Sequence, residues 1–191
     1  MRILLLSIAL SLSLSPAFAQ HTGNWDDTLI GRRQWEVPPL PYNGVDIVYS
    51  ENVPLVPAVP KEELFANAKN WLRNNLKTDF AQITEESVTE GKIRGEGEIY
   101  YNQAVLANGA PQSIFFSYDI NVTNNSYSYK IYDLVAKVGD EKFKYADMYR
   151  EEQKTMEATR WTHKYRYEML SDMDSFLKLF IAGLKNGIMT P

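Results

Sequence analysis

The sequence predicts an α+β domain in which one antiparallel sheet of about five strands carries two helices on one face. Three observations lead to this fold. Two segments repeat apolar residues at three- and four-residue spacing, the segments between them alternate apolar and polar residues, and hairpin turn residues separate the alternating segments. The predicted order is strand, helix, four strands, helix, with the first strand, at residues 45–50, ended by a proline cluster.

The first nineteen residues, MRILLLSIALSLSLSPAFA, have the three parts of a secretory signal peptide. Arg2 supplies the charge, residues 3–14 form the apolar run, and Ala17 and Ala19 are the small residues before the cleavage site. We expect cleavage before Gln20 and an exported protein of the periplasm or the extracellular space. The chain contains no cysteine, so disulfides and a lipid anchor on an N-terminal cysteine are not expected.

The remaining chain divides into a lead-in at residues 20–44 and one domain at residues 45–191. The lead-in is proline-rich and extended, and Trp25 and Trp35 are expected to pin it to the domain. The net charge is −4 for the whole chain and −5 once Arg2 is removed with the leader. This sign argues against nucleic acid or an anionic membrane as the partner.

The first predicted helix begins at Pro60, and Glu62 and Glu63 lie in its first turn, where the helix dipole favours acids. Its apolar stripe places Trp71 in the core. The stripe consists of Leu64, Phe65, Ala68, Trp71, Leu72 and Leu76.

The sheet continues with strands at residues 82–89 and 92–101. Gly95 and Gly97 fall on the inward side of the second of these strands, which suggests close approach by a helix or strong curvature. A hairpin follows, with strands at residues 112–123 and 127–135. The last helix is predicted at residues 170–185, with Gly187 marking its end.

These elements resemble the domain of unknown function 4468 family, a group of exported Bacteroidetes proteins with a TATA-binding-protein-like fold. The resemblance rests on EELFANAKNWLRNNL, KIRGEG, SIFFSYDINV and YSYKIYDL and covers residues 55–137. It implies the fold. It implies no activity and no catalytic residues, and the fold name does not imply DNA binding.

A charged excursion at residues 139–169 separates the fifth strand from the last helix. It carries seven acids and seven bases, so a basic nucleic-acid patch is a poor interpretation. We expect a helical or hairpin lid whose aromatic residues cover one end of the core, with a recognition loop as the alternative.

Catalytic candidates are few. His21 and His163 are the only histidines, and no nucleophile elbow is present. No catalytic residue, metal site or cofactor is assigned. Acid pairs are interpreted as a solvated face, namely Glu96 with Glu98, Asp172 with Asp174, and Glu151 with Glu152.

The leading hypothesis for function is a non-enzymatic binding or assembly module of the cell envelope that holds a protein, peptide or glycan. The alternatives are a carboxylate-dependent hydrolase of an extracellular polymer and a structural domain that associates with itself. Strand alternation places a set of polar and aromatic side chains on the face opposite the helices, where a partner could bind. The candidate binding residues are Tyr100, Phe115, Tyr132, Arg94, Glu96 and Lys130.

Overall fold

A computed structural model describes residues 37–76, 81–101, 112–138, 140–154 and 160–190. Export, cleavage before Gln20, the two lead-in tryptophans and His21 therefore concern residues outside the described part of the chain.

The described strands form one antiparallel sheet. The strands are β1 (Tyr49–Pro54), β2 (Gln82–Ser87), β3 (Lys92–Tyr101), β4 (Gln112–Val122), β5 (Ser126–Val138) and β6 (Glu141–Lys144). The main order is β1-β5-β4-β3-β2. β1 pairs with residues 126–131 of β5, and β6 pairs with residues 135–138 along the same edge. The predicted α+β class with a single antiparallel sheet is confirmed, with β6 as an additional short strand.

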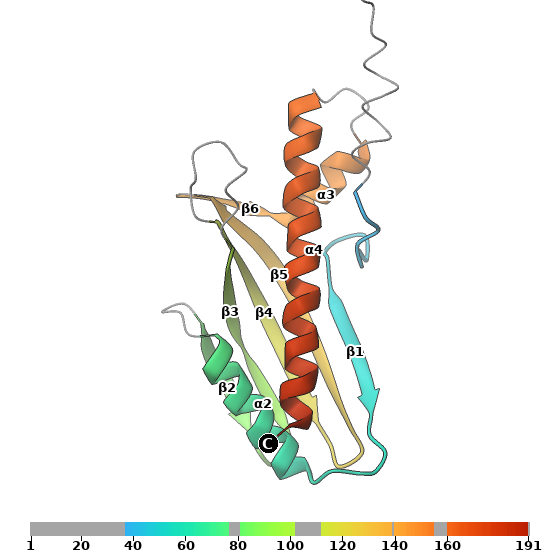
Figure 1. Ribbon diagram of the computed structural model, residues 1–191, viewed down its shortest axis with the longest axis vertical. Helices are drawn as coiled ribbons and strands as arrows, with labels where there is room; N and C mark the ends of the chain where they lie inside the picture. The colour runs from blue at the N-terminus through green and yellow to red at the C-terminus, as the bar shows by residue number, and fades with distance from the viewer. Residues whose placement is uncertain (1–36, 77–80, 102–111, 139, 155–159, 191) are drawn as a thin grey trace, which may run out of the picture.

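Two helices cover one face of this sheet (Figure 1). The described helices are α2 (Lys61–Asn75), α3 (Tyr145–Lys154) and α4 (Arg160–Met189), and the two that cover the face are α2 and α4. α4 runs along the length of the sheet, α2 lies beside the C-terminal half of α4, and α3 lies near its N-terminal half. We call the side under α2 and α4 the covered face and the opposite side the helix-free face.

A row of aromatic rings joins the helices to the sheet. The ring centroids of Trp71 in α2 and Phe180 in α4 are 5.1 Å apart, and those of Phe180 and Phe116 in β4 are 5.0 Å apart. Edge-to-face pairs of this kind add to the stabilisation from area burial. The predicted placement of Trp71 against the core is therefore confirmed.

Glycines make room for these rings. Gly97 lies opposite Phe116 in the register of β3 and β4, and a Cβ there would overlap the Phe116 ring. Gly95 is related to Tyr118 in the same way. The prediction of close approach at the two glycines was right, but the approaching groups are cross-strand aromatic rings and no helix.

Glycines also make room for an aromatic ring in the last helix, and the predicted end of this helix was wrong. α4 continues through Gly187 to Met189. A Cβ at Gly187 would overlap the Trp71 ring, and one at Gly183 would lie 2.9 Å from it. Gly187 is therefore a contact site for the α2 tryptophan and does not end the helix.

Other boundaries also differ from the prediction, most of all at the first strand and at the start of the last helix. The first strand runs over Tyr49–Pro54 instead of residues 45–50. The side chain of Asn43 accepts the backbone N–H groups of Val45 and Asp46, and this local turn delays the strand. The last helix begins ten residues earlier than predicted, at Arg160, because the charged half of the excursion is helical.

The excursion from residue 139 supplies β6, α3 and the first turns of α4. Tyr145 and Tyr149 of α3 are buried, and the Tyr149 ring packs edge-on against Tyr42 at 5.4 Å. The excursion thus covers one end of the core, as expected. Deeper in the core, Tyr49 of β1 donates a hydrogen bond of 2.8 Å to Asp174 of α4, which is also bonded to Lys178.

Candidate functional site

The helix-free face is organised in rows that cross the strands. Arg94, Asp119 and Lys130 are register partners on β3, β4 and β5. Because paired residues share a face, their side chains form one charged row. Arg94 Nε lies 2.6 Å from Asp119 Oδ1, and its Nη1 lies 3.3 Å from Glu85 Oε2. The hydrogen bond that Arg94 donates to Asp119 raises the pKa of Arg94. The charges in this row are balanced within the sheet.

Tyr132 belongs to the same end of the face. Lys130 Nζ lies 4.7 Å from the centre of its ring, which is a cation–π contact. Burial, and then the nearby Asp119 carboxylate, raise the pKa of Tyr132. This end of the face therefore has the structure of an ordinary solvated sheet in which charges and tyrosines satisfy one another.

The other end of the face is hollowed. The hollow has a volume of about 360 Å³. Phe115 lies in it, and Lys142 of β6 places its Nζ 5.4 Å from the centre of the Phe115 ring. The residues that line the hollow are Gln82, Glu96, Gly97, Phe115, Phe116, Ser117, Asp133, Val135 and Lys142.

A β-bulge accounts for the hollow. The pairing of β4 with β5 shifts between Phe115 and Ser117. On β5 the extra residues include Asp133, which has a φ of 53°, a left-handed conformation that aspartate adopts more readily than most residues. A bulge bends its strand and redirects the side chains around it. Beyond the bulge, β6 takes the edge position that β1 holds before it, and this brings Lys142 to the hollow.

A buried acid lies next to the hollow. Glu98 is the register partner of Phe115 and shares the helix-free face with Glu96. Its exposed fraction is 4%, and its Oε2 has no hydrogen-bond partner among the residues that the structure describes. A buried carboxylate oxygen without a hydrogen bond lowers the stability of the fold, because burial removes the water that would solvate it. The interpretation of Glu98 as a solvated acid was therefore wrong.

The structure separates the six predicted binding residues into groups. Phe115 and Glu96 line the hollow. Arg94, Lys130 and Tyr132 lie at the balanced end of the face. Tyr100 is 59% exposed and is the register partner of Ser113, one row beyond Phe115.

The lining residues that were not among the predicted binding residues include Gln82, Asp133 and Lys142. Asp133 follows Tyr132 in a strand whose alternation was read without a bulge. Lys142 lies in the charged excursion, where no periodic pattern marked a strand. The one signal for Asp133 was its residue type, since aspartate is favoured at left-handed positions.

The other acid pairs and His163 are engaged elsewhere. Asp174 is 6% exposed and bonded to Tyr49, so it is not solvated, and burial followed by Glu168 raises the pKa of Asp172. Glu152 contacts Nδ1 of His163, and Arg166 bridges to Glu151 at 2.8 Å. These contacts tie α3 to α4.

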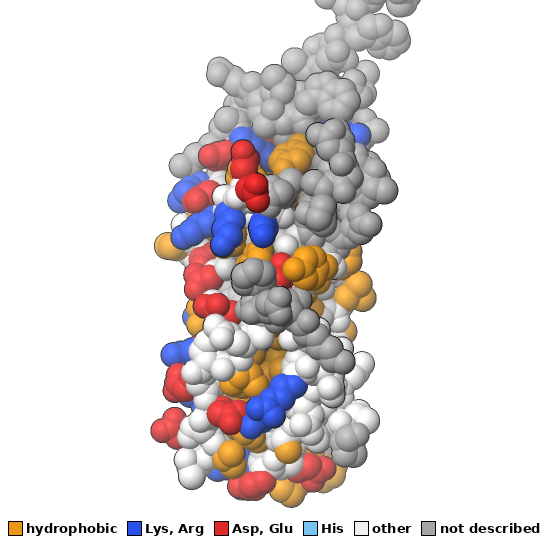
Figure 2. All heavy atoms as spheres, turned by 90° about the vertical axis from the view of Figure 1, so that its left-hand side faces the viewer, with side chains coloured by type: hydrophobic (Ala, Val, Ile, Leu, Met, Phe, Trp, Pro, Cys, Tyr) orange, Lys and Arg blue, Asp and Glu red, His pale blue; other side chains and the backbone are white. Residues whose placement is uncertain are grey.

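No group of three or more potential metal ligands occurs among the described residues. Within the same ranges, no helix has the length and apolar content needed to cross a membrane. On the side shown in Figure 2, acidic and basic side chains are interspersed and hydrophobic side chains lie between them.

Comparison with known proteins identifies the fold. Residues 49–137 match the family described as a domain of unknown function (DUF4468) with TBP-like fold. A DUF4468 family protein from Bacteroides ovatus has a similar structure, with a TM-score of 0.61 and 15% identity over 87% of this chain and 96% of that one. A TBP-like protein from Parabacteroides distasonis gives a TM-score of 0.60 and 14% identity over 79% of this chain and 97% of that one. No curated protein matches the sequence.

Proposed function

We propose a function on the basis of the helix-free face. The family that matches residues 49–137 is a domain of unknown function with TBP-like fold, so it indicates no activity. The protein is a non-enzymatic binding module of the cell envelope, and its partner docks on the hollow around Phe115. The leader-like first nineteen residues support export to the periplasm or beyond.

The observation that carries this proposal is the buried Oε2 of Glu98, which has no hydrogen-bond partner among the described residues and lies next to an aromatic hollow. Glu96 and Asp133 line the hollow, Glu98 adjoins it, and Lys142 is the one base among the lining residues. The hollow therefore has an excess of acid. In the row of Arg94, Asp119 and Lys130 the charges are balanced within the sheet. At the hollow, a partner that supplies a cation would balance the excess of acid.

The chemistry of the partner follows from this excess. Phe115 already holds the ammonium of Lys142 near its ring. Aromatic rings flanked by carboxylates bind ammonium and guanidinium groups. We therefore assign the partner as a protein segment that presents a lysine or arginine side chain, which replaces Lys142 over the ring.

Cross-linking in the native cell tests the proposal. The tagged protein and a variant with Tyr100, Phe115 and Tyr132 changed to Ala are cross-linked and the captured proteins are compared. The control is Leu179→Ala on α4, where the side chain is 68% exposed on the opposite side of the molecule. Binding at the hollow predicts loss of capture in the triple variant, with unchanged thermal unfolding, and full capture in the control.

Other outcomes of the same experiment would reject the proposal. Capture that survives the triple change places the partner elsewhere. Capture of further copies of this chain alone supports a self-associating structural domain. A captured glycan in place of a protein would contradict the assigned partner chemistry.

A hydrolase is the second candidate, because two carboxylates, Glu96 and Asp133, line the same hollow. Hydrolysis of a glycosidic bond needs two such acids on either side of the bond. If the protein cleaves an envelope polysaccharide, Glu96→Gln and Asp133→Asn each abolish release of reducing ends. Binding without cleavage by the wild-type protein excludes this alternative.

A further inference from the structure

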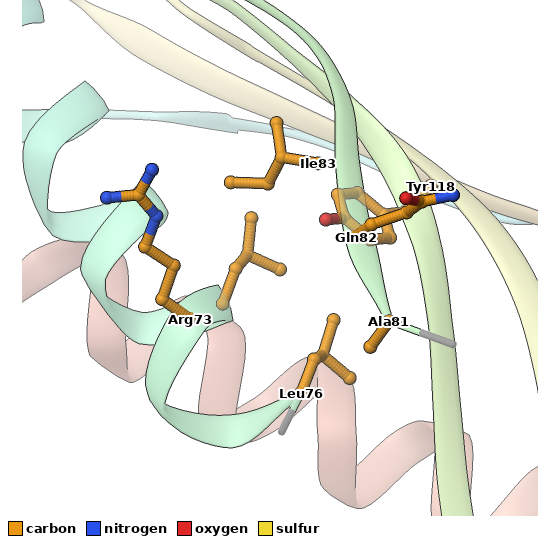
Figure 3. Close-up of a pocket in the computed structure, with 7 residues that line it drawn as sticks. Arg73, Leu76, Ala81, Gln82, Ile83 and Tyr118 are labelled. Atoms are coloured by element: carbon orange, nitrogen blue, oxygen red, sulfur yellow. The ribbon is translucent and has the colours of Figure 1, made fainter. Parts of the chain in front are cut away.

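A second cavity lies on the covered side of the molecule, between α2 and the edge strand β2 (Figure 3). Its volume is about 300 Å³, at the small end of the range for ligand pockets. The walls are apolar and come from Leu72 of α2, Leu76 directly after α2, Ala81 directly before β2 and Ile83 of β2. The polar groups that face or border it come from Tyr118 and Arg73.

The hydroxyl of Tyr118 points into this cavity (Figure 3). Tyr118 lies opposite Gly95, and a Cβ at Gly95 would overlap that hydroxyl. The glycine therefore lets the ring reach across β3 toward β2. The amide of Gln82, in contrast, points away from the cavity.

This hydroxyl forms no hydrogen bond with any residue that the structure describes, although Tyr118 is only 2% exposed. Burial raises the pKa of Tyr118 to about 12, so the hydroxyl keeps its proton at neutral pH and is available as a donor. Its oxygen is not among the fully buried side-chain atoms that lack a hydrogen-bond partner, so solvent in the cavity can reach it. A ligand acceptor inside the cavity would take the place of that solvent.

Arg73 provides a charge at the rim. It lies in the last turn of α2 and borders the cavity. Glu86, which senses the charge of Arg73, is already bonded to Lys69 at 2.8 Å. Arg73 has no ion pair among the described residues, and its planar guanidinium suits a carboxylate.

We propose that this cavity binds a small apolar carboxylate that carries one further hydrogen-bond acceptor. The carboxylate pairs with Arg73 at the rim, the apolar part packs between Leu72, Leu76 and Ile83, and the acceptor meets the Tyr118 hydroxyl. A hydroxylated fatty acid and the C-terminal residue of a peptide share this chemistry. The site is separate from the hollow on the helix-free face, so it stands or fails independently of the proposed function.

Chemical-shift titration of the full protein tests the site with two probes, 3-hydroxyoctanoate and N-acetyl-L-leucine. The neutral control probe is N-acetyl-L-leucine amide. We expect saturable binding of at least one acid, with shifts at Leu72, Ile83 and Tyr118, and binding of the amide weaker by about tenfold. The acid that binds more tightly identifies the fatty acid or the peptide terminus as the source.

Three conservative variants distinguish specific binding at this site from nonspecific hydrophobic binding. Tyr118→Phe removes only the hydroxyl and should weaken binding about three- to tenfold. Arg73→Gln should weaken it about tenfold or more, whereas Arg73→Lys should retain part of the affinity. The proposal is overturned if neither acid binds at about 10 mM, if the amide binds equally well, or if Tyr118→Phe leaves the affinity of both acids unchanged.

Discussion

The two faces of the sheet use alternate residues of the same strands and are completed in different ways. On the covered face, glycines admit the rings of Phe116 and Tyr118, and the buried Asp174 has both Tyr49 and Lys178 as partners. On the helix-free face, one end is balanced by ion pairs, while the other keeps a hollow beside an unpartnered Glu98. From this contrast we propose that the packing of the covered face carries most of the stability and that the protein partner docks on the helix-free face.

The largest effect should follow from removing the tryptophan that joins the two helices to the sheet. Trp71→Ala empties the space over Gly183 and Gly187 and removes the contact with Phe180. We expect the free energy of unfolding to fall by about 3–5 kcal/mol, as for other large-to-small changes in a core. Urea denaturation measures this, and Leu179→Ala is the exposed control. An unchanged midpoint would show that the covered face does not carry the stability.

The second-largest loss of stability should follow from removing the Tyr49 hydroxyl, which is hydrogen-bonded to Asp174. Tyr49→Phe removes a hydrogen bond to a carboxylate and should lower the free energy of unfolding by about 1.5–3 kcal/mol at neutral pH. Burial, and then Asp174, raise the pKa of Tyr49 above its ordinary value.

A pH dependence follows from the same shift. Because the folded-state pKa is the higher one, this stabilisation is complete below the unfolded tyrosine pKa of about 10 and is lost as the pH rises through the folded value. Denaturation at pH 8, 10 and 11 should therefore show a smaller loss of stability with pH in Tyr49→Phe than in the wild type. Parallel profiles would argue against the buried hydrogen bond.

The contact between Gly97 and the Phe116 ring can be tested by adding a methyl group at the glycine. Gly97→Ala forces a methyl group into the Phe116 ring, which Phe180 holds from the other side. Overpacking of this kind should cost about 1–3 kcal/mol in the free energy of unfolding. Combining it with Phe116→Leu should give a loss smaller than the sum of the two single losses. Strict additivity would mean that the ring and the glycine do not interact.

The smallest effect should have the opposite sign and lie on the helix-free face. Glu98→Gln replaces a buried, unpartnered carboxylate with a neutral amide of the same shape. We expect the free energy of unfolding to rise by about 0.5–2 kcal/mol, since functional positions are often unfavourable for stability. A loss of stability in this variant would indicate a structural partner for the carboxylate and weaken the assignment of the face to binding.

Much of the covered face could be predicted from the sequence because its signals are local. The stripe through Leu64, Ala68 and Leu72 has the helical period, and the alternation around Ile93 and Phe116 has the period of a strand. Both patterns give the correct inward side. Gly187 was misread because a glycine near a helix end resembles a cap, whereas its contact with Trp71 depends on a residue more than a hundred positions away.

The candidate site was only partly predictable for the same physical reason. Alternation placed Phe115 and Glu96 on the helix-free face correctly. The hollow itself depends on a bulge at Asp133 and on the pairing of β6, and neither has a periodic signature in the sequence. The burial of Glu98 likewise arises from tertiary packing, which charge patterning does not report.

The most direct test of the division between the two faces compares Phe115→Ala with Lys142→Ala in partner capture, with thermal unfolding measured for both. If a basic side chain of the partner replaces Lys142 over the Phe115 ring, Phe115→Ala abolishes capture and Lys142→Ala strengthens it, because the competing cation is gone. Both variants should unfold close to the wild-type temperature. Weaker capture in Lys142→Ala, or undiminished capture in Phe115→Ala, would contradict the account.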